Sequence, residues 1–227
     1  MTSAALNGLP QAALAGLSEH GVARDFAPGE WLYHEGEASH SVHVIDRGLV
    51  RLSKTALNGK RVLIGFLGSG ELAGHYATLI DGPRPASGRA LTATSTTCVP
   101  GDRFLDYLRA YPDLALTLLH ELADQLVATS AHVLELSTID ASSLIALRLV
   151  QLATEARFAE IRTRDGASIV VQSALSQHDL AAWAGVSERS AATALQRFRE
   201  LGVITTSRLR VEIRDVAALH RLAGRPR

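Results

Sequence analysis

The sequence predicts an α+β fold in which an antiparallel β-roll comes first, a long helix follows and a winged helix-turn-helix comes last. Three observations predict it: short apolar runs broken by glycines, a long helical apolar period, and two capped helices joined by a glycine. A chain of 227 residues has room for more than one domain. The expected parts are a β-roll domain, a long helix with a hinge, and a C-terminal winged domain, at residues 1–110, 111–139 and 140–227.

The composition is that of a folded protein, with 47% hydrophobic and 20% charged residues. No run of about 18 apolar residues predicts a membrane span, and residues 1–10 lack the basic residues of a signal peptide. The single cysteine, Cys98, excludes an internal disulfide framework and an iron–sulfur cluster held by several thiolates of one chain. We therefore expect a cytoplasmic protein without a metal site.

The charges are divided unevenly, although the net charge is zero. Residues 1–140 hold 10 basic and 15 acidic side chains, and residues 141–227 hold 13 and 8, so the two parts carry −5 and +5. All basic residues of the second part are arginines, whose planar guanidinium can bind a phosphate or a guanine edge through two hydrogen bonds. This pattern indicates either a nucleic-acid-binding segment or a solvated basic face.

Residues 22–104 predict the β-roll. Alternating apolar and polar residues, as in 42–45 and 50–52, predict short strands, and the glycines between them supply the backbone conformations that tight turns need. Asn58-Gly59 predicts a hairpin turn. A short helix at residues 9–17 is expected to precede the roll.

Residues 111–136 predict one long helix with Pro112 in its first turn. Residues along it recur with the spacing of a heptad seam, which predicts packing against a second copy of the chain. The alternative is that this seam covers the β-roll. Both can hold, because Leu114, Leu118 and Val127 lie on an adjacent face of the helix. The expected dimer interface consists of Leu119, Leu122, Leu126, Val133 and Leu136, with Thr129 in the same seam.

A hinge and two further elements are expected after the long helix. Asp140 can cap a second helix over residues 141–158. A β-hairpin is expected over residues 161–171, with Asp165-Gly166 at its turn.

The segment from Ser176 onward predicts a helix-turn-helix. Ser176, with Asp179 three residues later, resembles a capping box at the start of the first helix. Gly185 supplies the turn, and Ser187 caps a second helix that reaches residue 201 and ends at Gly202. Residues 203–205 and 209–213 can then pair as a wing.

Together these features resemble the CRP/FNR family along nearly the whole chain. The matching stretches include 26–30, 35–37 and 68–70 in the roll, 111–113 at the long helix, and 180–187 in the helix-turn-helix. The resemblance implies a homodimeric, sequence-specific transcription regulator with a cyclic-nucleotide-binding-like sensor domain. It further implies a pseudo-palindromic double-stranded DNA operator and RNA polymerase as a partner.

Two other functions stay open at this point. The chain could be a regulator that needs no ligand, or a cyclic-nucleotide-binding module that acts by protein contact. An enzyme is not expected, because the sequence has no nucleophile elbow, no paired zinc ligands and no P-loop.

The family's phosphate-binding cassette is matched only in part. Family spacing counted back from Arg84 places the cassette at residues 74–77. Residues 70–73 have a similar sequence to the cassette but do not have this spacing. Arg84 would neutralise a cyclic phosphate. His75, however, stands where the family has a ribose-binding Glu, and Pro85 replaces a hydroxyl residue and has no N–H to donate.

The base-binding end of this site is matched better, because Thr129 and Ser130 correspond to the family's adenine-contacting pair. The effector is then cAMP, another cyclic nucleotide or cyclic dinucleotide, or none if the pocket is silent. Haem near His75 is the least favoured ligand. The resemblance implies an effector site formed by Gly74, His75, Arg84, Thr129 and Ser130.

The second helix of the helix-turn-helix departs from the family pattern, because Glu188-Arg189 reverses the usual Arg-Glu order. We expect Arg189 to read a guanine and Glu188 to read a cytosine. Gln177, Ser190, Arg197 and Arg208 are expected to hold phosphates. The full expected DNA-binding set is Gln177, Ser187, Glu188, Arg189, Ser190, Thr193, Arg197 and Arg208.

Overall fold

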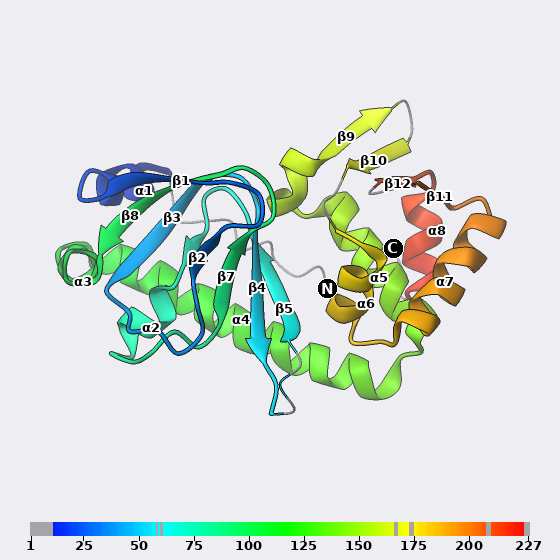
Figure 1. Cartoon of the computed structure of the whole chain (residues 1–227), viewed down its shortest axis with the longest axis horizontal. Helices are drawn as coiled ribbons and strands as arrows, with labels where there is room; N and C mark the ends of the chain where they lie inside the picture. The colour runs from blue at the N-terminus through cyan, green and yellow to red at the C-terminus, as the bar shows by residue number, and fades with distance from the viewer. Residues whose placement is uncertain are drawn as a thin grey trace. The chain divides into compact units, whose positions relative to one another are not determined.

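The computed structural model describes residues 11–57, 59, 61–165, 168–172, 175–207 and 210–224. The chain forms two compact units, residues 1–128 and 129–227, which meet within one long helix (Figure 1). The predicted α+β fold is confirmed, with antiparallel sheets in both units. No helix in the described part of the chain is long and apolar enough to cross a membrane.

The first unit is a β-roll made of two antiparallel sheets, ordered β1-β8-β3-β6 and β2-β7-β4-β5. The predicted hairpin joins β4 to β5, where Thr55 pairs with Arg61 and Gly59 has a φ of 78°; Asn58 lies outside the described residues. The strands are β1 (Val22–Phe26), β2 (Trp31–Tyr33), β3 (Ser41–Arg47), β4 (Val50–Thr55), β5 (Arg61–Leu67), β6 (Leu72–Ala73), β7 (Ser87–Ala90) and β8 (Thr94–Pro100).

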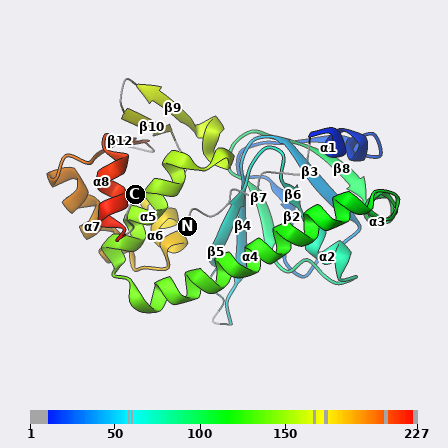
Figure 2. The same ribbon diagram turned by 180° about the vertical axis from the view of Figure 1, so that it is seen from behind.

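Four helices accompany the roll. One core cluster joins strand residues such as Val42 and Val99 to Phe104, and Leu114 and Leu118 of α4 pack into the same cluster. The first turns of α4 therefore cover the roll, and this helix runs beyond it in both views (Figures 1 and 2). The helices are α1 (Gln11–Ser18), α2 (His75–Leu79), α3 (Gly101–Ala110) and α4 (Pro112–Thr138).

One residue of α4 was assigned to the wrong face. Val127 was expected beside Leu114 and Leu118, but its side chain is 68% exposed. Val127 follows Leu118 by nine positions, and at 3.6 residues per turn this places Val127 on the opposite side of the helix.

The second unit contains one four-stranded sheet and several helices. The two predicted hairpins form a single antiparallel sheet, ordered β11-β12-β10-β9, in which Ile169 pairs with Ile213. The elements are α5 (Ala141–Thr154), the 3-10 helix η1 (Ala156–Ile161), β9 (Arg162–Asp165), β10 (Ser168–Gln172), α6 (Gln177–Ala184), α7 (Glu188–Glu200), β11 (Ile204–Ser207), β12 (Arg210–Ile213) and α8 (Val216–Leu222).

One boundary and one further helix in this unit differ from the sequence-based expectation. The helix expected to reach residue 158 ends at Thr154, because Glu155 has an extended backbone conformation. The 3-10 helix that follows places the buried Phe158 against Trp183, with ring centroids 5.5 Å apart. The last helix, α8, was not predicted, although Asp215 marks its start by accepting a hydrogen bond from the Ala218 N–H at 2.8 Å.

Candidate functional site

The helix-turn-helix is built by local capping. The Ser176 hydroxyl accepts a hydrogen bond from the Asp179 N–H at 3.2 Å, and the Asp179 carboxylate accepts one from the Ser176 N–H at 3.0 Å. This confirms the capping box. Gly185 ends α6 in the left-handed conformation, with a φ of 71°, and Ser187 caps α7 by accepting from the Ser190 N–H at 3.1 Å.

One face of α7 is buried and the other is exposed. The buried face consists of Ala191, Ala194, Leu195 and Phe198, which pack in the core of the unit. The opposite face presents the carboxylate of Glu188, the guanidinium of Arg189 and the hydroxyl of Thr193. Of the expected DNA-binding residues, Gln177, Ser187, Glu188, Arg189, Thr193 and Arg197 are exposed, Ser190 is partly buried, and Arg208 lies outside the described residues.

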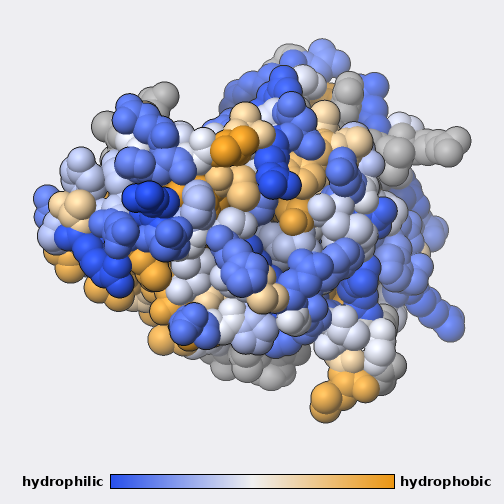
Figure 3. Space-filling view, turned by 60° about the vertical axis from the view of Figure 1, so that its left-hand side comes forward, coloured by the Kyte–Doolittle hydropathy of each residue, from blue (hydrophilic) through white to orange (hydrophobic). Residues whose placement is uncertain are grey.

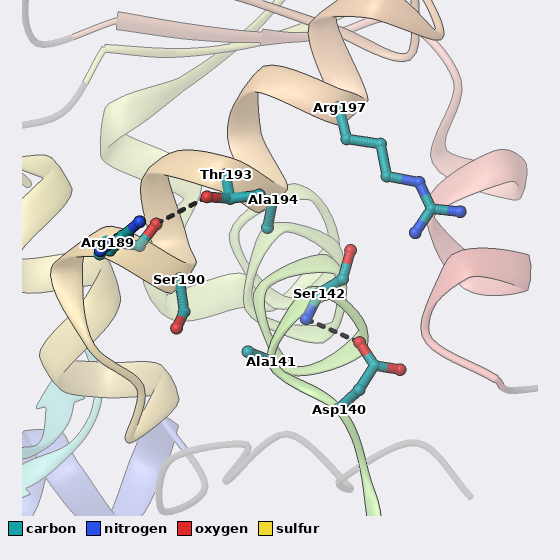
Figure 4. A pocket seen from close by; sticks show the side chains of 8 residues that line it. All are labelled: Asp140, Ala141, Ser142, Arg189, Ser190, Thr193, Ala194 and Arg197. Carbon is teal, nitrogen blue, oxygen red and sulfur yellow. Dashed lines mark hydrogen bonds between the residues drawn. The ribbon is translucent and has the colours of Figure 1, made fainter.

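An open hollow of about 420 Å³ lies between the start of α5 and the first three turns of α7. The hollow is lined by Asp140, which caps α5, by two residues of α5 and by five residues of α7. Figure 4 shows Arg189 and Arg197 at opposite sides of the hollow. The lining residues are Asp140, Ala141, Ser142, Arg189, Ser190, Thr193, Ala194 and Arg197.

Asp140 holds the start of α5 at the rim of this hollow. Its carboxylate accepts hydrogen bonds from the N–H groups of Ser142 and Ser143, at 2.8 and 3.1 Å, so the predicted cap is confirmed. Hydrogen bonds from the Ser143 backbone and side chain, then from Ser142, lower the pKa of Asp140, and the charge of Arg197 acts in the same direction. Asp140 is therefore ionised at neutral pH.

Sequence reasoning missed Ser142, which follows the cap by two positions. Its hydroxyl oxygen is buried and has no hydrogen-bond partner among the described residues. The Asp140 carboxylate already accepts from the N–H groups of Ser142 and Ser143, so this buried hydroxyl lies at a helix start that its own cap satisfies. The only signal in the sequence was its position after a capping aspartate.

The structure also brings His178 of α6 to Glu188 of α7, which sequence reasoning did not foresee. The Nδ1 atom of His178 lies 2.8 Å from the Oε1 atom of Glu188. Both side chains are exposed. The spacing of ten residues between them carries no helical signal, because the contact depends on how the turn at Gly185 places the two helices.

The predicted wing is confirmed as the β11–β12 hairpin. Arg199 of α7 donates a hydrogen bond to the Thr206 hydroxyl at 3.1 Å, which ties the helix to the first strand of the wing. Arg210, at the start of β12, is exposed. The wing therefore carries an exposed positive charge.

In the β-roll, Arg84 is buried at 4% exposure beside the predicted cassette. Its guanidinium donates to the carbonyl oxygens of Gly74 at 2.7 Å and Ser41 at 2.6 Å. It also lies over the Tyr33 ring, 4.5 Å from the centroid. A Cβ at position 74 would lie 1.9 Å from the guanidinium, so only glycine fits there, and the structure brings Gly74, His75 and Arg84 together as expected.

His75 is not equivalent to the carboxylate that the family resemblance places there. Its Nδ1 atom lies 3.2 Å from the Leu72 carbonyl oxygen, so Nδ1 carries the proton and donates. Burial lowers the pKa of His75 to about 4, against the opposing effect of the Leu72 carbonyl. His75 is therefore neutral near pH 7 and provides no negative charge.

A second buried histidine lies inside the roll. His43 shares a 3.1 Å hydrogen bond with the Thr96 hydroxyl and has its ring centroid 6.2 Å from that of Tyr33. Burial, together with the charges of Arg84 and Arg24, lowers the pKa of His43 to about 4. Burial also raises the pKa of Tyr33 to about 12. Both rings are thus uncharged neighbours of Arg84.

The remaining predicted residues lie on α4. Thr129 and Ser130 are exposed and belong to the second unit, so their predicted part in the effector site stays a prediction. In the expected seam, Leu119 is 58% and Leu126 is 68% exposed, and Leu122 is partly buried. The side chains of Val133 and Leu136 lie outside the described residues. Hydrophobic patches are visible between hydrophilic ones on the face shown in Figure 3.

No group of three or more histidine, cysteine, aspartate or glutamate side chains that could hold a metal ion occurs in the described part of the chain. Cys98 is a free, partly buried cysteine of β8.

Comparison with known proteins identifies both units. The family model for the cyclic nucleotide-binding domain matches residues 23–111, and the model for the Crp-like helix-turn-helix domain matches residues 141–222. These two domains in this order define a DNA-binding transcription regulator with a cyclic-nucleotide-binding-type sensor. The chain belongs to the CRP/FNR family of transcription regulators.

The relatives agree with this assignment along nearly the full length of the chain. The chain is 27% identical to the CRP-like cAMP-activated global transcriptional regulator of Mycobacterium tuberculosis, over 95% of this chain and 94% of that protein. It is 28% identical to the cyclic AMP receptor protein of Thermus thermophilus, over 88% and 87%. The first of these relatives is named as a transcriptional regulator and the second as a receptor protein.

Solved structures show the same architecture. A CRP-family transcriptional regulator from Thermus thermophilus superposes with a TM-score of 0.72 and 25% identity, covering 88% of this chain and 96% of that chain. The CLP regulator of Xanthomonas campestris shares the fold alone, with a TM-score of 0.76 and 17% identity, covering 91% of this chain and 100% of that chain.

Proposed function

We propose that this regulator is a cytoplasmic homodimer that reads a pseudo-palindromic DNA operator through α7, under the control of a cyclic nucleotide. The observation that carries the DNA-reading part is the exposed face of α7, where Arg189 and Glu188 stand at the start of a rigidly capped helix. In helix-turn-helix proteins this end of the second helix contacts base edges in the major groove. RNA polymerase is the proposed protein partner, by family resemblance.

The roles of individual residues follow from their chemistry. Arg189 has the donors to contact the two acceptors of a guanine, and Glu188 has only acceptors, which suit an amino group. Gln177, Ser190 and Arg197 are the proposed phosphate contacts; Ser190 and Arg197 line the hollow, and Gln177 is exposed at the start of α6.

The test of DNA reading compares two arginines. In Arg189→Ala, discrimination at one base pair of each half-site should fall by roughly 1–3 kcal/mol, because a base contact is lost. In Arg210→Ala, affinity for all DNA should fall alike and the salt dependence should weaken by about one unit of slope, because a phosphate contact is lost. Binding to randomised and selected duplexes at several salt concentrations measures both. Equal effects of both variants on every sequence would exclude Arg189 as a base reader.

Control by a cyclic nucleotide rests on the domain match, on the relatives named for cAMP and on the retained Arg84. A cyclic phosphate would have to compete for Arg84 with the Gly74 and Ser41 carbonyls. His75 offers no carboxylate to a ribose hydroxyl, and Pro85 offers no N–H. Losing one charge-assisted hydrogen bond would cost roughly 1.5–3 kcal/mol, a tenfold to hundredfold loss of affinity.

Calorimetric titration with cAMP tests this second part. The wild-type chain should bind cAMP, and Arg84→Met should abolish the heat, whereas Arg109→Met, a change in an exposed ion pair of the same unit, should leave it unchanged. Absence of heat from the wild-type chain at millimolar cAMP would exclude cAMP control. Cyclic dinucleotides would then be tested next, and a negative result with these would favour DNA binding without a ligand.

A further inference from the structure

The contact between His178 and Glu188 links the two helices of the helix-turn-helix at the end that faces the proposed DNA site. His178 is the second residue of α6, and Glu188 is the first residue of α7. Nδ1 and Oε1 are 2.8 Å apart, with the side chains 56% and 66% exposed. Solvent, and therefore a ligand, can reach both groups.

The direction of this hydrogen bond is fixed by chemistry. An ionised carboxylate can only accept hydrogen bonds, so Nδ1 of His178 must carry the proton. The bond holds one oxygen of Glu188. The other oxygen, Oε2, has no hydrogen-bond partner among the described residues, and it can accept only from a group that carries hydrogen.

The position and charge of Oε2 determine which groups on a base it can contact. Glu188 sits where helix-turn-helix proteins contact base edges, and nearby phosphates would repel a loose carboxylate. In the major groove, cytosine and adenine present amino donors, whereas guanine and thymine present acceptors at the corresponding positions. A restrained carboxylate would therefore favour a base with an amino group and reject one with a carbonyl.

We propose that His178 is a positioning residue for base recognition, which holds Glu188 so that its second oxygen accepts a hydrogen bond from an exocyclic amino group in the major groove. This inference rests on the proposed DNA-reading function of α7. It goes beyond that function, because it assigns a specificity role to a residue of the first helix. The opposing view is that the contact is an ordinary exposed ion pair, which contributes little.

The experiment determines base preference by selection from randomised duplexes, using the full chain. Glu188→Ala first identifies the base pair that Glu188 governs. His178→Asn then keeps an N–H donor close to the position of Nδ1, whereas His178→Leu has nearly the same size and no donor. Arg109→Leu, which breaks an exposed 2.7 Å ion pair outside this unit, controls for loss of a surface contact. Circular dichroism checks that each variant is folded.

The expected result is specific to one base pair. At the position governed by Glu188, His178→Leu should lower the preference for cytosine or adenine about fivefold, a loss of about 1 kcal/mol, while all other positions keep their preference. His178→Asn and Arg109→Leu should retain the wild-type preference within about twofold.

Three results would overturn the inference. Unchanged preference in His178→Leu would show that Glu188 needs no positioning, and a loss in His178→Asn equal to that in His178→Leu would show that the donor is irrelevant. A Glu188→Ala variant with wild-type preference at every position would show that Glu188 reads no base. Failure of the wild-type chain to select any sequence is a different outcome, because it would reject the proposed function itself.

Discussion

At the scale of single residues, the interior of the β-roll is organised around one buried cation. The Arg84 guanidinium donates to two carbonyl oxygens and lies over the Tyr33 ring. Such contacts compensate the cost of burying a charge, which would otherwise be several kcal/mol. The histidines nearby avoid that cost in another way, since burial keeps them neutral.

The neutral state of His43 predicts that acid weakens the first unit. The pKa of His43 is lowered to about 4 in the folded chain, against about 6.5 in an unfolded chain. Between these values the unfolded chain binds more protons, so the free energy of unfolding falls as the pH falls. From about pH 7 to about pH 5, this one residue should remove about 2 kcal/mol.

Urea unfolding at both pH values measures this effect. Trp31 is the only tryptophan of the first unit, so a Trp183→Phe background makes its fluorescence report that unit. His43→Gln should lose less stability on acidification than the parent does. An identical loss in the two proteins would mean that His43 does not take part.

At the scale of elements, the turn between α6 and α7 depends on one glycine. Gly185 has a φ of 71° and a ψ of 25°, a conformation that costs other residues about 1–2 kcal/mol. Gly185→Ala should therefore destabilise the second unit by about that amount and weaken DNA binding, because α7 is misplaced. Gly65→Ala, where nothing lies within 4 Å of the added Cβ and φ is not positive, should cost less than about 0.5 kcal/mol.

Fluorescence of Trp183 in a Trp31→Phe background follows the unfolding of the second unit for Gly185→Ala. For Gly65→Ala, the fluorescence of Trp31 in a Trp183→Phe background follows the unfolding of the first unit. Equal stability of Gly185→Ala and its parent would contradict the role assigned to the left-handed cap.

Elements with local signals could be predicted from the sequence. Caps such as Asp140, Ser176 and Ser187 fix helix starts through neighbouring residues, and the hairpin turns are likewise local. The end of α5 and the joining of two hairpins into one sheet could not be predicted, because both depend on tertiary packing. The candidate site divides in the same way: the exposed residues of α7 follow from helical periodicity, whereas the contacts of His178 and Ser142 depend on how helices meet.

At the scale of the whole molecule, the two parts differ in net charge, and 13 of the 21 arginines lie in residues 141–227, the DNA-binding part. A symmetric dimer would present two copies of α7 to a two-fold operator. We propose that the exposed leucines of α4 form the surface of such a dimer, because burial of large apolar side chains against a second copy would be favourable.

Dimer formation should therefore depend on this seam. Leu126→Glu places a charge at a side chain that is 68% exposed in the single chain, and it should weaken dimerisation at least tenfold, because a buried unpaired charge costs several kcal/mol. Leu201→Glu makes the same change at an exposed leucine after α7 and should leave the dimer intact. Sedimentation equilibrium compares the two. A fully dimeric Leu126→Glu variant would place the interface elsewhere.

The pairing of β10 with β12 has a consequence for motion. Because Ile169 pairs with Ile213, the polypeptide between them, including α6 and α7, is a closed loop whose two ends are hydrogen-bonded together. The helix that would read DNA is thus part of one cooperative unit with strands far from it in sequence. The amide protons of α7 should therefore exchange with solvent when that sheet opens. A substitution that weakens the pairing of β10 with β12 should raise the exchange rate of α7.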